Sequence, residues 1–453
     1  MKRQALIEEC FREDYRYEAD HLYKELSVNG VAHRSSVRGN GETPDRYGWW
    51  KAYLNGETPR TSSHDSTEAA HVDTTTRPTT GVLRTVDLFC GAGGLALGTR
   101  QAANELGLAF EAVAAADTDK DALGVYEANH GSLLKSSKSV TQIVNFKIRD
   151  SRVNATFARP PRIMVPQWRE LVGQVDIVLA GPPCQGHSNL NNRTRRDDPR
   201  NLLYLTVPAL AIALEAPMVL IENVESVVHD RQGVVQTTVQ LLRSSGYEVS
   251  FGVVNAAALG WPQTRKRFFL VASREQVPIP VRQIADELAA TEPRNVMWAI
   301  GDLVGQEPDD EMNRLPTMSD DNLRRIKWLH DNNAHDLAID QRPVSHQDED
   351  VFEERKSVYG RMHVDRPSPT ITTGFMTPGR GRYVHPTEPR VLTPNEAARL
   401  QGFPDTYCWR LPDGSPPKSQ SLAKWIGDAV PMPLGYTAAL SILGPLVSQR
   451  GAR

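Results

Sequence analysis

The chain of 453 residues is poor in cysteine, and its few thiols show no pairing pattern. The four cysteines, Cys10, Cys90, Cys184 and Cys408, lie far apart and form no CxxC pair. This spacing offers neither a disulfide framework nor the ligand pattern of a structural zinc site. We therefore expect a reducing, cytoplasmic location and no bound metal.

Long apolar runs are also missing. No run reaches the ~18 residues that a membrane-spanning helix requires. The N-terminus begins Met1-Lys2-Arg3-Gln4 and then turns acidic, so it lacks the apolar core of a signal peptide. The sequence therefore predicts no membrane partner.

The chain has no excess of positive charge, because its 52 Lys and Arg residues stand against 55 Asp and Glu. A surface for nucleic acid would need cations gathered locally. Two loops, residues 191–200 and 378–383, are locally basic. Their arginines are Arg193, Arg195, Arg196, Arg380 and Arg382. We expect these side chains to contact phosphates, with an ordinary solvated loop as the alternative for each.

One thiol stands in an unusual position. The apolar run of residues 175–180 leads directly into Gly181-Pro182-Pro183-Cys184-Gln185-Gly186-His187-Ser188. Such a run is typical of a buried strand, and open α/β sheets carry their chemistry on the loops at strand ends. A lone cysteine is usually a small buried hydrophobe, but this one has motifs around it that favour a catalytic role.

Five further segments surround this loop in sequence order. A glycine-rich turn, Asp87-Leu88-Phe89-Cys90-Gly91-Ala92-Gly93-Gly94, follows the apolar run of residues 83–86, as in many nucleotide-type cofactor sites. Glu222-Asn223-Val224 follows the apolar run of residues 218–221. The remaining three are residues 263–267, 366–373 and 427–431.

Together these segments resemble the motifs of the DNA (cytosine-5) methyltransferases of bacterial restriction-modification systems. The family's DxFxGxGG pattern is matched by Asp87, Phe89, Gly91, Gly93 and Gly94, and its QxRxR motif by Gln263, Arg265 and Arg267. The resemblance covers residues 81 to 445. It implies transfer of a methyl group from S-adenosyl-L-methionine to C5 of a flipped-out cytosine in double-stranded DNA. A monomer that works beside a cognate restriction or defence system is expected.

The resemblance also assigns catalytic roles. C5 of cytosine is a poor nucleophile until a thiolate, here that of Cys184, adds at C6. The proton that N3 then needs is expected from Glu222, if burial keeps that carboxyl protonated. Arg265 is expected to bind O2 of the base and position Glu222, and Arg267 to hold the loop that bears Cys184.

The cofactor residues implied by the resemblance come from several segments. Asp117, after the apolar run of residues 112–116, is expected to bind the ribose hydroxyls, with Asp119 as its rival and one of the two serving as a helix N-cap. The acidic residue that normally follows the third strand has no clear counterpart, although Asp150 is one candidate. The expected cofactor set is Phe89, Gly91, Gly93, Gly94, Asp117, Pro183, Asp428 and Val430.

Alternating strands and helices predict an α/β fold, with a mainly parallel Rossmann-like sheet typical of S-adenosylmethionine-dependent methyltransferases. A smaller, irregular target-recognition domain is expected beside it. The predicted parts are a helical N-terminal extension at 1–54, a flexible linker at 55–80, the catalytic domain at 81–273, the recognition domain at 274–409, and a segment at 410–453 that completes the catalytic domain. The extension is expected to hold an amphipathic helix with Leu6, Ile7, Phe11, Leu22, Tyr23 and Leu26 as its apolar positions, followed by a turn-rich segment with Trp49 and Trp50.

Two other functions remain open from the sequence. An RNA cytosine-5 methyltransferase of the same fold would use the same Cys184 and Glu222. A non-catalytic DNA-binding regulator would have retired these residues, yet the cysteine, the glutamate and the glycine loop are all present. The target sequence cannot be deduced, because its reading loops are expected within residues 275–365, which match no motif.

Overall fold

The computed structural model describes residues 11–39, 43–57, 59–61, 81–150, 152–183, 203–306, 310–348 and 357–451. The chain divides into two compact units. Unit 1 comprises residues 1–254, 266–289 and 432–453, and unit 2 comprises residues 255–265 and 290–431.

Unit 1 is built on a seven-stranded sheet in the order β14-β15-β13-β12-β5-β6-β7 within the described residues. Its strands are β5 (Val82–Leu88), β6 (Ala109–Ala116), β7 (Leu134–Ser136), β12 (Ile177–Ala180), β13 (Met218–Asn223), β14 (Glu248–Asn255) and β15 (Lys266–Ser273). The strands from β13 to β7 in this order run parallel, whereas β15 is antiparallel to β13. Every residue of β12 and β13 is buried, as expected for parallel strands covered on both faces. The predicted α/β fold is thus confirmed.

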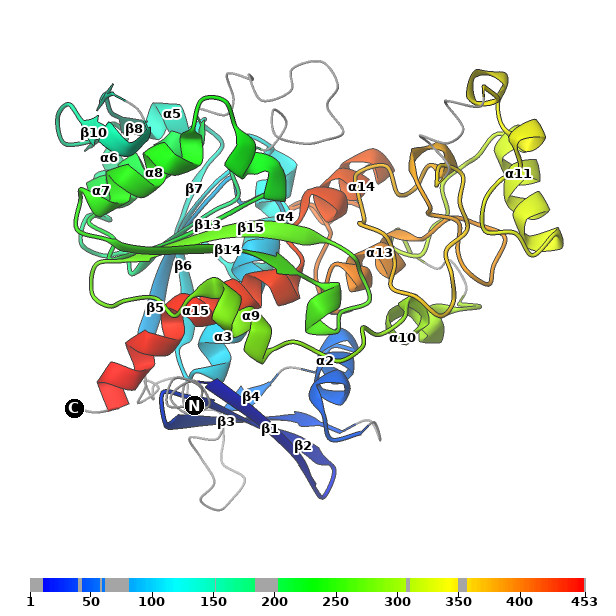
Figure 1. The fold of residues 1–453 in the computed structure, drawn as a ribbon, viewed down its shortest axis with the longest axis horizontal. Coiled ribbons are helices and arrows are strands. Elements are labelled where there is room, and N and C mark those ends of the chain that lie inside the picture. The colour runs from blue at the N-terminus through cyan, green and yellow to red at the C-terminus, as the bar shows by residue number, and fades with distance from the viewer. Residues whose placement is uncertain are drawn as a thin grey trace. The chain divides into compact units, whose positions relative to one another are not determined.

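Helices cover both faces of this sheet (Figure 1). On one face lie α3 (Gly94–Glu105), α9 (Val281–Glu287) and α15 (Met432–Gly451). On the other face lie α7 (Thr206–Ala213) and α8 (Val234–Arg243). Between β6 and β7 the chain forms α4 (Lys120–His130). These helices bury the apolar surface that the continuous strands present.

The segment between β7 and β12 is made of short elements. Helices α5 (Val140–Ile143) and α6 (Pro166–Arg169) accompany two small antiparallel sheets. The pairs are β8 (Val144–Asn145) with β11 (Arg162–Ile163), and β9 (Ile148–Arg149) with β10 (Thr156–Phe157). Single-turn 3-10 helices are η1 (Arg152–Asn154) here and η3 (Glu225–His229) after β13.

The N-terminal region differs from the expected helix. It forms an antiparallel sheet of β1 (Phe11–Glu18), β2 (His21–Val28), β3 (Val31–Arg38) and β4 (Arg60–Thr61). Buried and half-buried residues alternate along β2, which is the period of a strand and not of a helix. Asn29 and Gly30 both have positive φ, the signature of a tight two-residue hairpin turn. The predicted N-terminal helix was therefore wrong; its positions Leu6 and Ile7 lie outside the described residues.

The segment between β3 and β4, which was expected to be turn-rich, forms a helix. Helix α2 (Arg46–Leu54) carries Trp49 and Trp50, both buried. Asp45 caps it by accepting hydrogen bonds from the backbone N–H groups of Tyr47 and Gly48.

Unit 2 is irregular, as expected for the smaller domain. Its described residues form isolated bridges and short helices instead of extended strands. These helices are η4 (Ala257–Leu259), α10 (Val296–Ile300), η5 (Gly301–Leu303), α11 (Asp320–Asp331), η6 (Ile339–Gln341), η7 (Val344–His346), η8 (Pro378–Arg380), α13 (Pro394–Leu400) and α14 (Ser419–Asp428). A small core forms where Ile326 and Leu329 of α11 pack with Leu337, Val384 and Val391.

The unit boundaries differ from those expected. Residues 255–265 belong to unit 2, where Gln263 pairs with Ser368 in a parallel bridge. Helix α14 also belongs to unit 2, where it packs on α13, while α15 returns to unit 1 and packs on α3. The segment expected to complete the catalytic domain from residue 410 therefore does so only from residue 432.

The C-terminal helices include one stretch, Ser419–Val447, that is long and apolar enough to cross a membrane. The sequence reading had found no such stretch. Its most apolar window is entirely buried inside the protein, as in the core helix of a globular fold.

Candidate active site

Four loops of unit 1 leave the sheet at one level. Leu88 of β5 pairs with Ala116 of β6 and with Ala180 of β12, and Ala180 pairs with Ile221 of β13. Because these strands are parallel, the segments after them share the carboxyl edge of the sheet, where open α/β sheets bind ligands. The glycine-rich turn, Asp117, residues 181–183 and Glu222 are thereby brought together.

The glycine-rich turn is bent in a way that favours glycine. Gly91 and Gly93 have positive φ, and a Cβ built on Gly91 would meet only open space. Phe89 also has positive φ, which is uncommon for an aromatic residue and typical of functional turns. Gly93 stands at the N-cap of α3, so the first N–H groups of that helix are directed toward the same edge.

Asp117 and Asp119 make different contacts. Asp119 is the N-cap of α4 and accepts from the N–H of Ala122 at 3.2 Å. The Oδ2 atom of Asp117 accepts from the N–H of Gly91 at 2.9 Å, so Asp117 lies against the glycine-rich turn. The expected helix N-cap is thus Asp119, and the ribose contact of Asp117 stays a prediction.

Asp150 is one candidate for the acidic residue that normally follows the third strand. Strand β7 ends at Ser136, whose carbonyl accepts from the N–H of Asp117 at 3.1 Å. Asp150 instead follows β9 in one of the small sheets. Asp150 therefore does not follow β7, where the chain continues with Ser137, Lys138 and Ser139.

Glu222 forms an ion pair at the end of β13. Its Oε1 atom lies 2.8 Å from Nε of Arg267, and the two side chains are only 10% and 15% exposed. A Cβ built on Gly181 would lie 3.8 Å from Oε2 of Glu222, so the carboxylate borders the loop that leads to residue 184. Arg267 therefore contacts Glu222 in unit 1, and the roles expected of Arg265 and Arg267 stay predictions.

Arg265 has a different environment within unit 2. It is 2% exposed and donates from Nη1 to the carbonyl of Ile371 at 2.5 Å and to that of Gly427 at 3.1 Å. These bonds join two of the motifs found in the sequence, residues 366–373 and 427–431. A Cβ on Gly427 would lie 2.3 Å from the backbone nitrogen of Thr373, so only glycine allows this approach.

Residues 181–183, with Pro182 and Pro183, form the start of a loop that we call the proline loop. Sequence reasoning missed a residue that holds this loop. Nδ2 of Asn223 donates to the carbonyl of Pro182 at 3.1 Å, and Asn223 is 1% exposed. Its place directly after Glu222 in an apolar strand was a usable signal, because a buried amide there requires partners. Pro183 is half-buried next to this contact. Cys184, Arg193, Arg195 and Arg196 lie outside the described residues.

The two expected cofactor residues of the C-terminal motif both lie in unit 2. Val430 is buried. Asp428 is the last residue of α14, and its largely exposed side chain forms an ion pair of 3.1 Å with Lys424.

The two arginines of the second basic loop, residues 378–383, have different surroundings. Arg380 is exposed. Arg382 forms an ion pair with Asp336 and donates to the carbonyls of His335 and Arg361. The guanidinium of Arg382 is thus engaged within unit 2, and its expected contact with phosphate stays a prediction.

The glycine-rich turn contains a buried carboxyl group, that of Asp87, and a buried thiol, that of Cys90. Asp87 is 1% exposed, and burial together with the nearby charge of Asp117 raises its pKa to about 8. Burial, with Asp87 and Asp117 adding to it, raises the pKa of the Cys90 thiol well above its usual value. A thiol held neutral in this way is a poor nucleophile, which leaves Cys90 a packing role.

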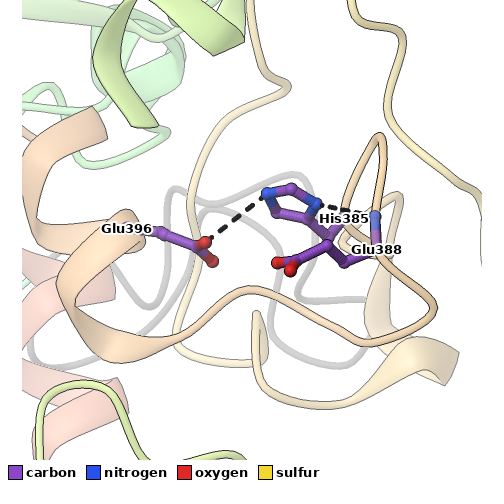
Figure 2. A group of neighbouring side chains, drawn as sticks. All are labelled: His385, Glu388 and Glu396. Carbon is purple, nitrogen blue, oxygen red and sulfur yellow. Dashed lines mark hydrogen bonds and ion pairs between the residues drawn. The ribbon is translucent and has the colours of Figure 1, made fainter. Parts of the chain in front are cut away.

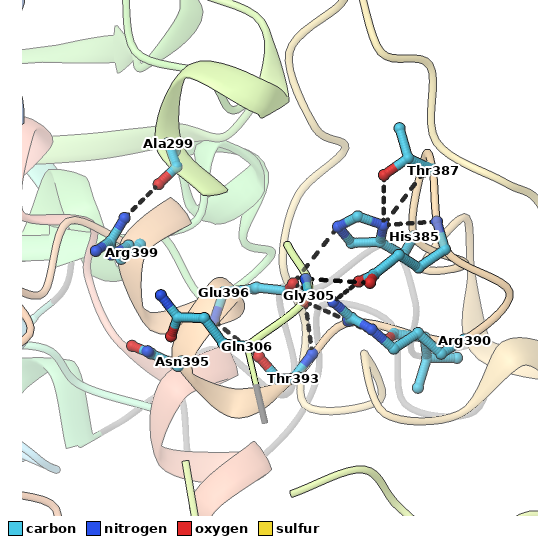
Figure 3. A network of polar contacts seen from close by, with 12 residues as sticks. Ala299, Gly305, Gln306, His385, Thr387, Arg390, Thr393, Asn395, Glu396 and Arg399 are labelled. Atoms are coloured by element: carbon cyan, nitrogen blue, oxygen red, sulfur yellow. Dashed lines mark hydrogen bonds and ion pairs between the residues drawn. The ribbon is translucent and has the colours of Figure 1, made fainter. Parts of the chain in front are cut away.

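Within the described residues, one cluster has the spacing of metal ligands. Ligand atoms of His385, Glu388 and Glu396 lie within 4.8 Å of one another in unit 2 (Figure 2). However, Nδ1 of His385 accepts from the backbone N–H of Thr387 and Glu388. Arg390 bonds to the carboxylates of Glu388 and Glu396. Figure 3 shows Arg390 together with His385 and Glu396.

Glu396 and His385 have further constraints. Glu396 closes a capping box with Thr393 at the start of α13. Burial and the nearby charge of Arg390 lower the pKa of His385 to about 3, so the ring is neutral. These contacts describe a structural network that anchors α13, with the carboxylates committed to arginine.

The chain is similar to known proteins over most of its length. A model of the C-5 cytosine-specific DNA methylase family matches residues 83–443. The Type II methyltransferase M1.BsuMI of Bacillus subtilis is 38% identical over 365 residues, which are 81% of this chain and 81% of that protein. The Type II methylase M.HgiDII of Herpetosiphon aurantiacus is 30% identical over 79% of this chain and 94% of its own length.

Solved structures share the fold. A prophage-encoded DNA modification methyltransferase from E. coli matches with a TM-score of 0.51 and 22% identity, over 80% of this chain and 99% of its own. The S. pombe Dnmt2 methyltransferase matches with a TM-score of 0.50 and 18% identity, over 80% and 99% of the two chains. The glycine-rich turn, the Glu222–Arg267 pair and the proline loop all lie inside the matched region. The chain belongs to the C-5 cytosine-specific DNA methylase family.

Proposed function

We propose that this protein is a DNA (cytosine-5) methyltransferase of restriction-modification type, which methylates a specific duplex sequence. The observation that carries the proposal is the ion pair of Glu222 and Arg267 at the carboxyl edge of the sheet, where the proline loop lies between this pair and the glycine-rich turn. The names of the relatives support the same activity, since both are Type II enzymes of DNA methylation.

The residues at this edge fit S-adenosyl-L-methionine. Gly91 and Gly93 let a ligand approach the backbone, and α3 presents its first N–H groups. Asp117 offers a carboxylate at the end of β6, as ribose hydroxyls require. When bound, the cofactor supplies the methyl group for C5.

The protein's own residues supply covalent and acid catalysis. The thiolate of Cys184 adds to C6 of the cytosine, which makes C5 nucleophilic. Arg267 fixes the orientation of the Glu222 carboxyl group and favours its ionised form, so Glu222 takes up a proton before it delivers one to N3. Asn223 holds the backbone of Pro182, two residues before the nucleophile. Base extrusion precedes these steps, because C6 is inaccessible in stacked duplex DNA.

Unit 2 is proposed to read the target. Arg380 is exposed in it and suits a phosphate contact. We further propose that the protein is a monomer, acts in the cytoplasm and works beside a cognate restriction or defence system.

A trapping experiment tests the mechanism. Duplexes with 5-fluorocytosine at the target should form a stable adduct with the wild type and cofactor, since fluorine does not leave C5 as a proton does. Cys184→Ser should form no adduct while it binds S-adenosylhomocysteine normally. Bisulfite sequencing of host DNA identifies the target for such duplexes, and transfer RNA serves as the competing substrate. Adduct formation by the serine variant, or methyl transfer to transfer RNA alone, would remove the proposal.

A further inference from the structure

The N-terminal sheet lies outside the family match, which begins at residue 83. It is nevertheless tied to helices of the matched region through one buried cation. Lys24, in the middle of β2, is 0% exposed. Lysine is almost never fully buried unless it is paired, so its partners indicate what the sheet does.

The ammonium group of Lys24 bonds to three different elements. Its Nζ atom lies 2.8 Å from Oε1 of Glu13 in β1 and 2.8 Å from Oε2 of Glu105 in α3. It also donates to the hydroxyl of Tyr436 in α15 at 2.9 Å. The rings of Tyr15, Trp49, Trp50 and Tyr436 surround it, with centroids 5.7, 5.7, 5.5 and 5.1 Å away. Such a cage suits a cation that has left water.

The cluster balances its charges. Arg46 of α2 lies 2.7 Å from Oε2 of Glu13, so two cations face two carboxylates. Burial alone would raise the pKa of Glu13, but Lys24 and Arg46 outweigh it and lower that pKa to about 2. Removal of one member would leave an uncompensated charge inside the protein.

Glu105 is the member with a consequence for the site. It is the last residue of α3, where the helix dipole disfavours a carboxylate. Lys24 supplies the compensating cation, while Trp49 Nε1 and Gln101 Nε2 donate to the other oxygen of Glu105. The carboxyl end of α3 is thereby fixed to the N-terminal sheet.

The other end of α3 carries the glycine-rich turn. Gly93 is its N-cap, and Gly94 is its first residue. Between the two ends, Gly98 packs so closely on α15 that a Cβ there would lie 2.6 Å from the backbone nitrogen of Tyr436. Tyr436 also donates from its hydroxyl to Glu105 at 2.6 Å. Because a helix moves as a stiff rod, a constraint at Glu105 also constrains the turn at Gly93.

We propose that Lys24 is a positioning residue for the cofactor, which through Glu105 and Tyr436 sets the position of α3 and thus of the glycine-rich turn. The inference rests on the proposed function for the identity of the cofactor. It gives the N-terminal sheet a role in cofactor binding that the family motifs do not contain.

The test uses the full chain with Lys24→Met, which keeps the length of the side chain and removes its charge. Calorimetry without DNA should show binding of S-adenosylhomocysteine weakened by about fivefold or more. Affinity for duplex DNA should stay unchanged, since the altered turn serves the cofactor. Arg34→Met is the matched control, because this cation of β3 is exposed and pairs with Glu25 at the surface of the sheet. It should leave both affinities as in the wild type.

A double-variant cycle separates positioning from general loss of stability. Lys24→Met and Glu105→Gln break the same tie, so their effects on cofactor affinity should be strongly non-additive. If Lys24→Met does not fold, Tyr436→Phe removes a single hydroxyl from the same tie and should weaken the cofactor alone. A folded Lys24→Met that binds S-adenosylhomocysteine normally, or that loses cofactor and DNA affinity equally, would overturn the inference.

These outcomes are independent of methyl transfer. If the wild type methylates DNA and Lys24→Met binds S-adenosylhomocysteine normally, the inference fails and the proposed function stands. If the wild type binds S-adenosylhomocysteine but transfers no methyl group to DNA, the proposed function fails. The comparison of Lys24→Met with Arg34→Met then still decides the inference.

Discussion

The carboxylate of Glu222 lies 2.8 Å from the guanidinium of Arg267, because Glu222 stands near the end of β13 and Arg267 near the start of β15, and these two strands pair antiparallel. Both side chains are largely buried, so the pair is shielded from salt and held in one geometry. In unit 1 this contact orients the carboxyl group that the mechanism requires.

The first prediction follows from this pair. Arg267→Met should lower kcat for methyl transfer by about 100-fold, the usual size of a lost general-acid contribution. The KM for S-adenosylmethionine should change little, because Arg267 does not touch the glycine-rich turn. Steady-state kinetics on a cognate duplex measures both. Arg282→Met, at an exposed position on α9, is the control and should behave as the wild type. A rise in KM without a fall in kcat would contradict the role of Arg267.

The two arginines of the second basic loop should respond differently. Arg380→Ala should weaken DNA binding on every sequence and reduce the slope of log affinity against log salt by about 1, as for one lost phosphate contact. Arg382→Ala should instead cost about 2 kcal/mol of stability, because it removes the partner of Asp336 and two bonds to carbonyl groups. Binding titrations at several salt concentrations and urea unfolding distinguish the two outcomes. An unchanged salt slope in Arg380→Ala would mean that this arginine does not contact phosphate.

Helix packing between α3 and α15 gives a prediction with an internal control. A Cβ at Gly98 would lie 2.6 Å from the nitrogen of Tyr436, whereas a Cβ at Gly435 would meet its nearest atoms at 3.5 Å. Gly98→Ala should therefore destabilise the protein by about 2 kcal/mol through overpacking. Gly435→Ala should be neutral or stabilising by up to roughly 1 kcal/mol, since alanine favours helix. Equal effects of the two substitutions in urea unfolding would show that the helices separate more easily than the structure indicates.

Asp87 predicts a pH dependence of stability. Burial, aided by Asp117, raises its pKa from 3.8 to about 8. Between these values the folded protein keeps a proton that the unfolded chain has released, so this group's contribution to stability falls as pH rises through the window. The amide of Asp87→Asn does not titrate, so the free energy of unfolding of this variant should lack that pH dependence. Unfolding in urea at about pH 5, 7 and 9 should show the wild type losing stability relative to the variant. A constant difference across this range would count against the raised pKa.

The sequence by itself determined the family and the local chemistry. Asp87, Phe89 and the glycines that follow are adjacent along the chain, so their turn is readable without a structure. Glu222 directly follows an apolar strand, and the carboxyl ends of parallel strands share one edge. The turn and the position of Glu222 can be predicted because they depend only on the spacing of residues that are close together in the sequence.

Only the tertiary structure decided which side chains meet. The contact of Arg267 with Glu222 depends on strand pairing, and the engagement of Arg382 by Asp336 depends on loops that are distant in sequence. The N-terminal sheet was misread because apolar positions such as Leu22 and Leu26 fit a helix as well as a strand. The buried Lys24 between them makes sense only once Glu13, Glu105 and Tyr436 surround it. A buried charge needs partners from several elements, and folding alone brings those elements together.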